Sequence, residues 1–264
     1  MKTARVARER RHALYFLQEF RSFAPVFLDT EIDMSRVLEH RVAARAGGER
    51  VSVVSYIVFV AARVLAKHPE ANAAMVGRRR PRVAQYSAVN VKVAFDKTLN
   101  GHRIVLTSVL PDADQGSLAE IQERIDRCRD GDPAQLPEFA GVRLLHRLPW
   151  PLGPIALRIG ARPLSKRATT LGTLAVTSLG HRPVDGIHTM AGTTITLGLG
   201  RTLDRPVVRD GQIVVAPVMR LNFTFDHRMI DGAEAADILA EIKDGLEEFA
   251  EPGAGVVEAA PTCR

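Results

Sequence analysis

The chain has 264 residues, of which 46% are hydrophobic and 25% are charged, and its net charge is +6 at pH 7. This balance indicates a soluble globular protein with a sizeable core. No apolar run reaches the roughly 18 residues that span a bilayer, and the basic N-terminus lacks the features of a secretory signal, so we expect a cytoplasmic protein. Aromatic residues form only 5% of the chain and do not interleave with the basic clusters, which argues against a nucleic-acid partner.

The N-terminal third of the chain combines helical and extended patterns. Residues 1–20 predict a basic helix, and residues 24–37 predict a strand that leads into a second helix. Residues 51–75 predict a long, mostly buried helix that ends near Pro69.

A hairpin is predicted next. Residues 87–97 and 102–110 are rich in β-branched side chains, and Asn100-Gly101 lies between them. The Arg-rich stretch 78–82 predicts a solvated turn, with phosphate binding as the alternative.

The C-terminal half begins with an amphipathic helix at residues 118–130 and ends in another at 232–249. Residues 141–168 differ in composition from the rest of the chain, because basic and bulky apolar side chains cluster there around the only tryptophan. Strand-like runs then occupy residues 172–180, 193–201 and 213–227. Strands and helices mix without strict alternation, which predicts an α+β fold: a mixed sheet with helices on one face. We expect a single domain over residues 1–250 and a flexible tail at 251–264.

The chain has two cysteines, too few for a disulfide framework or a thiolate metal cluster, and we expect no metal site. Cys128 recurs with apolar residues at helical spacing, which predicts a buried position on the 118–130 helix. Cys263 lies in the tail. Neither cysteine indicates a catalytic nucleophile.

Two hexapeptides share the pattern His-x-x-x-Asp-Gly: HRPVDG at 181–186 and HRMIDG at 227–232. The second copy lies where a predicted strand ends and a helix begins, so Asp231 can accept hydrogen bonds at the helix start. The first copy contains Pro183 and is followed by an irregular loop, which favours an ordinary loop histidine. A solvated turn histidine is the alternative for the second copy too.

The stretch FTFDHRMIDGAEAADIL (223–239) resembles the signature of the catalytic domain of 2-oxoacid dehydrogenase dihydrolipoamide acyltransferases, relatives of chloramphenicol acetyltransferase. Further segments resemble that family in the same order, from the long helix ending in HPEANA to GTLAVTSLG (172–180) and LGLGR (197–201). The similarity covers roughly residues 10–250.

The resemblance implies a chloramphenicol acetyltransferase-like fold, coenzyme A or acyl-CoA as co-substrate, and a homotrimer with active sites in channels between subunits. It implies His227 as general base, Asp231 as its structural partner, and Thr177 of the neighbouring subunit as the hydroxyl that stabilises the oxyanion. Ser178 and His181 are candidates for lining the channel. A neutral imidazole can take a proton from a thiol or hydroxyl at pH 7, and a hydroxyl aimed at the oxyanion contributes a few kcal/mol.

Three departures from the family stand out. No lipoyl domain, subunit-binding domain or linker is recognised, so we expect no lipoyl attachment on this chain. The family's Asn-Pro-Pro loop is replaced by HTMAGTT (188–194). The stretch 141–168 is an apolar and basic insertion. Packing within the oligomer is the simplest role for it; covering a lipophilic substrate or lying on a membrane surface are the alternatives.

We therefore expect a stand-alone, CoA-dependent acyltransferase that moves a short acyl group, acetyl by default, to a hydroxyl or thiol of a small molecule or carrier in specialised metabolism. One alternative is a dihydrolipoamide acyltransferase core subunit served by a separate lipoyl protein. Another is a non-catalytic trimeric scaffold, against which the presence of Thr177, His227 and Asp231 argues. The sequence identifies no coenzyme A ligand, acyl chain length or acceptor.

Overall fold

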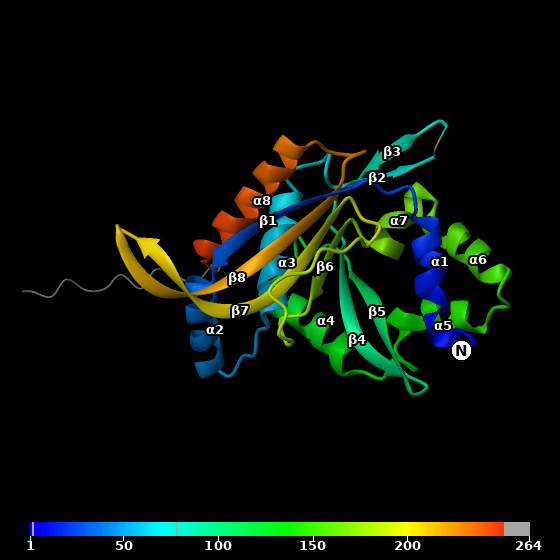
Figure 1. The fold of residues 1–264 in the computed structure, drawn as a ribbon, viewed down its shortest axis with the longest axis horizontal. Coiled ribbons are helices and arrows are strands. Elements are labelled where there is room, and N and C mark those ends of the chain that lie inside the picture. The colour runs from blue at the N-terminus through cyan, green and yellow to red at the C-terminus, as the bar shows by residue number, and fades with distance from the viewer. Residues whose placement is uncertain (2, 78, 251–264) are drawn as a thin grey trace, which may run out of the picture.

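A computed structural model describes residues 1, 3–77 and 79–250, and it is built around one six-stranded mixed sheet (Figure 1). The strand order is β1-β8-β7-β6-β4-β5, with β6 parallel to β4 and β7 and the other pairs antiparallel. The strands are β1 (Pro25–Asp33), β4 (Val91–Leu99), β5 (His102–Leu110), β6 (Leu174–Ser178), β7 (Ile195–Arg209) and β8 (Gln212–Asp226). The expected α+β fold with a mixed sheet is confirmed.

Three helices pack against the sheet, namely α3 (Val53–Leu65), α4 (Leu118–Asp130) and α8 (Gly232–Glu247), while α2 (Ser35–Ala46) packs on α8, and together they bury most of the core. Ten of the 13 residues of α3 are buried, which explains why its sequence is apolar on every side. Ser52 caps α3 by accepting a hydrogen bond from the Ser55 N–H at 3.3 Å. The predicted long helix is therefore confirmed, although it ends at Leu65, before Pro69.

The predicted hairpin is also confirmed. Strands β4 and β5 pair along their whole length, and Asn100 and Gly101 between them have φ values of 50° and 77°. Left-handed conformations at both turn positions are what an Asn-Gly turn supplies. A second, two-stranded sheet is formed by β2 (Ala73–Val76) and β3 (Arg82–Gln85), and Arg82, expected in the Arg-rich turn, is the first residue of β3.

A second group of helices lies beside β5: α1 (Arg11–Glu19), α5 (Ala140–Arg147), α6 (Leu152–Ala161) and α7 (Leu164–Leu171), with short 3-10 helices η1 (Arg8–Arg10) and η2 (Pro137–Phe139) (Figure 1). Buried Tyr15 lies against Gly153, where a Cβ would come within 2.2 Å of the ring. Glu19 binds Arg158 at 3.1 Å and also Arg162. The stretch 141–168 is thus helical and packs on α1, while Trp150 and Ile159 stay 51% and 69% exposed.

Cys128 is buried on α4 as predicted, and burial raises the pKa of its thiol, so a thiolate is disfavoured at neutral pH. Arg78, Cys263 and the tail at 251–264 lie outside the described residues. Within the described residues, no helix is long and apolar enough to cross a membrane. The same residues contain no group of three or more His, Cys, Asp or Glu side chains that could hold a metal ion.

Candidate active site

His227 stands in the short connection between β8 and α8. Its main-chain N–H donates to the Ala24 carbonyl at 2.9 Å, and its Nδ1 lies 3.4 Å from Oδ1 of Asp231, which occupies the N-cap position of α8. The expectation that the Asp231 side chain accepts hydrogen bonds at the helix start is wrong, because it makes no capping hydrogen bond and turns towards the imidazole. At this distance the carboxylate favours the tautomer with the proton on Nδ1, which leaves Nε2 as the basic atom. The imidazole is 49% exposed in a single chain, so its reactive edge is open to a ligand or to another subunit.

The main chain on either side of His227 is fixed by the side chains of Asp226 and Arg228. The buried Asp226 carboxylate accepts from Arg228 Nε at 2.8 Å and from Arg228 Nη2, and these hydrogen bonds raise the pKa of Arg228. The Asp226 N–H donates to the Thr194 carbonyl at 3.0 Å. Sequence reasoning missed this pair, although the alternating charges in Asp-His-Arg were the available signal.

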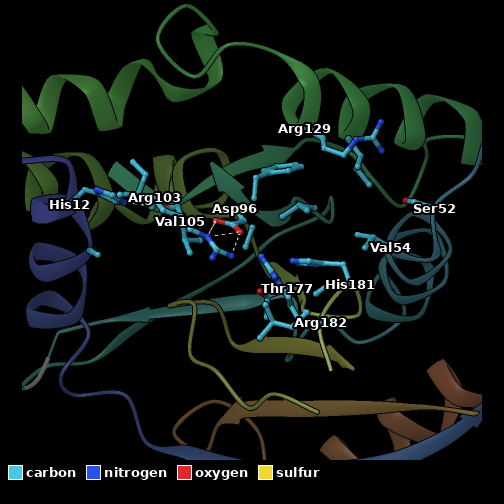
Figure 2. Close-up of a pocket in the computed structure, with 18 of the residues that line it drawn as sticks. His12, Ser52, Val54, Asp96, Arg103, Val105, Arg129, Thr177, His181 and Arg182 are labelled. Atoms are coloured by element: carbon cyan, nitrogen blue, oxygen red, sulfur yellow. Dashed lines mark hydrogen bonds and ion pairs between the residues drawn. The ribbon is translucent and has the colours of Figure 1, made fainter. Parts of the chain in front are cut away.

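A cavity of about 830 Å³ opens where β4 and β6 separate. These strands pair only from Val91 to Val93 on β4, so Thr177 and Ser178 lie just beyond the paired segment of β6. Figure 2 shows Thr177, His181 and Arg182 at this cavity, with Asp96 and Arg103 from the β4–β5 hairpin. Three of the five site residues expected from the sequence, Thr177, Ser178 and His181, therefore line one cavity.

The other two expected site residues, His227 and Asp231, are not at this cavity. Thr177 lies opposite Gly198, which lies opposite Asn222 on β8, and His227 follows Asn222 by five residues, just after β8 ends. At about 3.3 Å per residue and 4.8 Å between strands, the α-carbons of Thr177 and His227 lie about 19 Å apart. A threonine and a histidine side chain cannot span that distance. One chain therefore does not assemble the histidine and the threonine into a single site.

The first hexapeptide forms a loop that lies directly on β7. A Cβ at Gly200 would come within 2.0 Å of the Asp185 carbonyl oxygen, so glycine is needed on β7 for this close approach. Asp185 accepts from Arg201 Nε at 2.8 Å, and this hydrogen bond lowers the pKa of Asp185. Among the described contacts Asp185 has no interaction with His181. The aspartate of this copy therefore anchors the loop.

Asn222 is a further residue that sequence reasoning missed. It is 2% exposed, and its Oδ1 accepts from the Ile187 N–H at 2.8 Å. Its Nδ2 lies 3.0 Å from Nε2 of His188, whose ring packs edge-on against Phe27. A lone amide in the apolar run RLNFTF was the signal that could have found it. Asn222 ties the loop that follows HRPVDG to β8, the strand that leads into His227.

The catalytic-domain model of the 2-oxoacid dehydrogenases acyltransferase family matches residues 3–132 and 156–253. The chain belongs to this family. The unmatched residues, 133–155, overlap the expected insertion at 141–168 without coinciding with it. They include α5 and the start of α6, so the family model does not match this part of the helical group beside β5.

Two curated relatives are named as dihydrolipoyllysine-residue acyltransferases. The dihydrolipoyllysine-residue acetyltransferase component of the Bacillus subtilis pyruvate dehydrogenase complex is 28% identical over 231 residues, covering 84% of this chain and 45% of the relative. The dihydrolipoyllysine-residue succinyltransferase component of the Cupriavidus necator 2-oxoglutarate dehydrogenase complex is 30% identical over 205 residues, covering 76% and 41%. The chain therefore spans less than half the length of either relative.

Solved structures share the fold at low sequence identity. A probable dihydrolipoamide acetyltransferase from Listeria monocytogenes superposes with a TM-score of 0.71 at 17% identity, covering 96% of this chain and 97% of that one. The cubic core of a pyruvate dehydrogenase multienzyme complex gives 0.67 at 19% identity, covering 94% and 92%. These likenesses confirm the fold that the resemblance implied.

Proposed function

We propose that this protein transfers an acyl group between coenzyme A and a thiol of a dihydrolipoyl group, with His227 as general base. The observation that carries the proposal is the His227–Asp231 pair, placed at a strand end inside the family signature with its main chain fixed by Asp226 and Arg228. Both relatives described above are named as dihydrolipoyllysine acyltransferases, which supports a dihydrolipoyl acceptor over the small-molecule hydroxyl expected from the sequence.

The proposed site forms between two copies of the chain. His227 and Thr177 lie about 19 Å apart in one chain, as their strand register requires. The half-exposed imidazole can meet Thr177 only if a second copy brings the cavity to it. In a ring of identical subunits, each subunit brings its His227 to one neighbour and its Thr177 cavity to the other. A homotrimer would therefore contain three equivalent sites.

The chemistry follows from these groups. His227 Nε2 takes the proton of the acceptor thiol, and the thiolate sulfur attacks the carbonyl carbon of the acyl-CoA thioester. The tetrahedral oxyanion accepts a hydrogen bond from the Thr177 hydroxyl of the other subunit, worth a few kcal/mol in such sites. The intermediate collapses, the bond to the coenzyme A sulfur breaks, and the imidazolium returns its proton to that sulfur. Asp231 stabilises the imidazolium, and no acyl group is attached to the enzyme.

The test is an acyl-transfer assay with acetyl-CoA and dihydrolipoamide, followed by mass spectrometry of the S-acyl product. We expect product formation that depends on His227. Absence of S-acylated product from the folded, assembled protein would contradict the dihydrolipoyl acceptor. If the protein instead acylates a hydroxyl compound supplied in place of dihydrolipoamide, the proposed acceptor is wrong and the general-base mechanism stands.

A further inference from the structure

The cavity lined by Thr177 carries a net positive charge, because the arginines that line it outnumber the carboxylates. We infer that the substrate filling it carries a carboxylate on an apolar chain, and that Arg182 and Arg10 bind this carboxylate. The inference rests on the proposed function for the identity of the reacting atoms. It adds a substrate class: of two otherwise similar molecules, the protein should prefer the one that carries the carboxylate.

Asp96 is the only carboxylate among the residues lining the cavity, and it is already paired. Its Oδ1 and Oδ2 accept from Arg103 Nε at 2.8 and 2.9 Å, and Arg103 Nη2 adds a further hydrogen bond. These bonds lower the pKa of Asp96, and the charges of Arg182 and His181 act in the same direction. Arg182 thus faces a carboxylate whose charge Arg103 has neutralised.

The remaining arginines of the cavity fall into two groups. Arg129 is held by Asp126 at 2.7 Å and Asp130 at 2.8 Å, both on its own helix. Arg10 and Arg182 have no carboxylate within ion-pair distance among the described residues. Two uncompensated guanidinium groups at a cavity beside Thr177 favour an anion there, and guanidinium binds carboxylate in a bidentate geometry.

His12 contributes shape to the cavity rather than charge. Its Nε2 donates to the Val105 carbonyl at 3.1 Å, so its Nδ1 accepts from Nε2 of His146 at 2.9 Å. Burial lowers the pKa of His12 and brings the pKa of His146 to about 4, so both rings are neutral at pH 7. His146 belongs to α5, within the residues that the family model leaves unmatched.

The rest of the lining explains the apolar part of the inferred substrate. Aliphatic and aromatic side chains from α3, α4, the β4–β5 hairpin and the loop after β6 supply most of the wall: Val54, Val93, Phe95, Ile104, Val105, Ile125 and Leu179. A fully hydrated ion would leave this surface unused. An acyl or acceptor chain that ends in a carboxylate uses both the apolar wall and the two arginines.

Two matched substrate pairs separate the two possible sources of the carboxylate. Succinyl-CoA and butyryl-CoA differ by a carboxylate in place of a methyl group at the end of the acyl chain. Dihydrolipoate and dihydrolipoamide differ by a carboxylate in place of an amide on the acceptor. We expect the wild type to prefer the charged member of one pair by about tenfold or more in kcat/KM. The pair that shows the preference identifies the source.

Substitution at the arginines tests the assignment. Arg182→Gln should abolish the preference, mainly through KM, and Arg182→Lys should retain part of it. The matched control is Arg129→Gln, which removes a paired arginine from the same cavity and should leave the ratio unchanged. Circular dichroism and the oligomer size measured by gel filtration check that the Arg182→Gln variant is folded and assembled.

Three results would overturn the inference. The first is equal use of both members in both pairs by the wild type. The second is an equal rise in KM for every acyl-CoA in Arg182→Gln, which would assign the arginine to coenzyme A itself. The third is the same loss of preference in Arg129→Gln.

A binding measurement keeps the test independent of turnover. Titration calorimetry with dihydrolipoate and dihydrolipoamide, or with succinyl-CoA and butyryl-CoA, reads the same preference directly. An inactive wild type that still binds the charged member more tightly, through Arg182, would contradict the proposed function and support the carboxylate site. Turnover without any charge preference would support the proposed function and contradict the carboxylate site.

Discussion

HRMIDG and HRPVDG place the same residue types at the same spacing in two different settings. In the first, Asp231 lies 3.4 Å from His227 at the N-cap position of a helix, where its side chain makes no capping hydrogen bond. In the second, Asp185 is hydrogen-bonded to Arg201 in a loop packed on β7. The two aspartates differ because an arginine competes with the histidine for the carboxylate in only one of them. Asp185 is hydrogen-bonded to Arg201 and is not available to His181, whereas Asp231 lies beside His227.

The strongest test of this contrast removes each histidine in turn. His227→Ala should lower kcat by about 10²–10⁴-fold, because the thiol loses its general base. His181→Ala, at the rim of the cavity, should change kcat by less than about tenfold, since it takes no proton in the mechanism. Steady-state CoA release measures both, with circular dichroism to check folding. Losses of equal size would mean that the wrong copy has been assigned.

The two aspartates give a smaller effect. Asp231→Ala should reduce kcat by about tenfold to a hundredfold, because the imidazolium loses its stabilising charge and its preferred tautomer. Asp185→Ala should leave kcat within a few-fold and lower the melting temperature, because Arg201 loses its partner. Parallel kinetics and thermal melts separate these outcomes. A kcat loss in Asp185→Ala as deep as in Asp231→Ala would contradict the anchoring role of Asp185.

Lys92 offers a stability test of the segment that connects the two hexapeptides. Its Nζ donates to the Ala191 carbonyl, and Arg167 Nη2 donates to the Gly192 carbonyl at 3.0 Å. Burial, with the nearby charge of Arg167 as a smaller cause, lowers the pKa of Lys92 from 10.5 to about 7. Between these values the unfolded chain binds more protons than the folded one, so stability rises with pH through this window.

We expect the free energy of unfolding of the wild type to rise by about 1 kcal/mol between pH 7 and pH 8 from this residue. Lys92→Met, which removes the buried cation, should flatten that rise and should be more stable than the wild type near pH 7. Denaturant unfolding at fixed protein concentration measures both. An identical pH slope in the two proteins would show that Lys92 stays charged in the fold.

Local patterns predicted the parts of the structure that depend on neighbouring residues. The apolar run of α3, the Asn100-Gly101 turn and the strand–helix junction at His227 each depend on propensity and periodicity within a short segment. The resemblance added Thr177, which no local pattern would have singled out.

The remaining features depend on contacts between distant segments. The short pairing of β4 with β6, which opens the cavity, is a matter of register between residues 83 positions apart in the chain. The alternation in VNVKVAF places Lys92 on the polar face of its strand, yet the 188–194 loop covers it. Asn222 and the Asp226–Arg228 pair likewise acquire their roles only when the loop folds back on the sheet.

The central claim, that one site takes His227 from one chain and Thr177 from another, is tested most directly by mixing two inactive variants. Thr177→Ala and His227→Ala are each expected to be inactive alone, and co-expression should form hybrid oligomers. Random mixing pairs an intact histidine with an intact threonine at about one interface in four, so about a quarter of the wild-type activity should return. Hybrid oligomers that form, as mass spectrometry can show, but stay inactive would contradict a site shared between subunits.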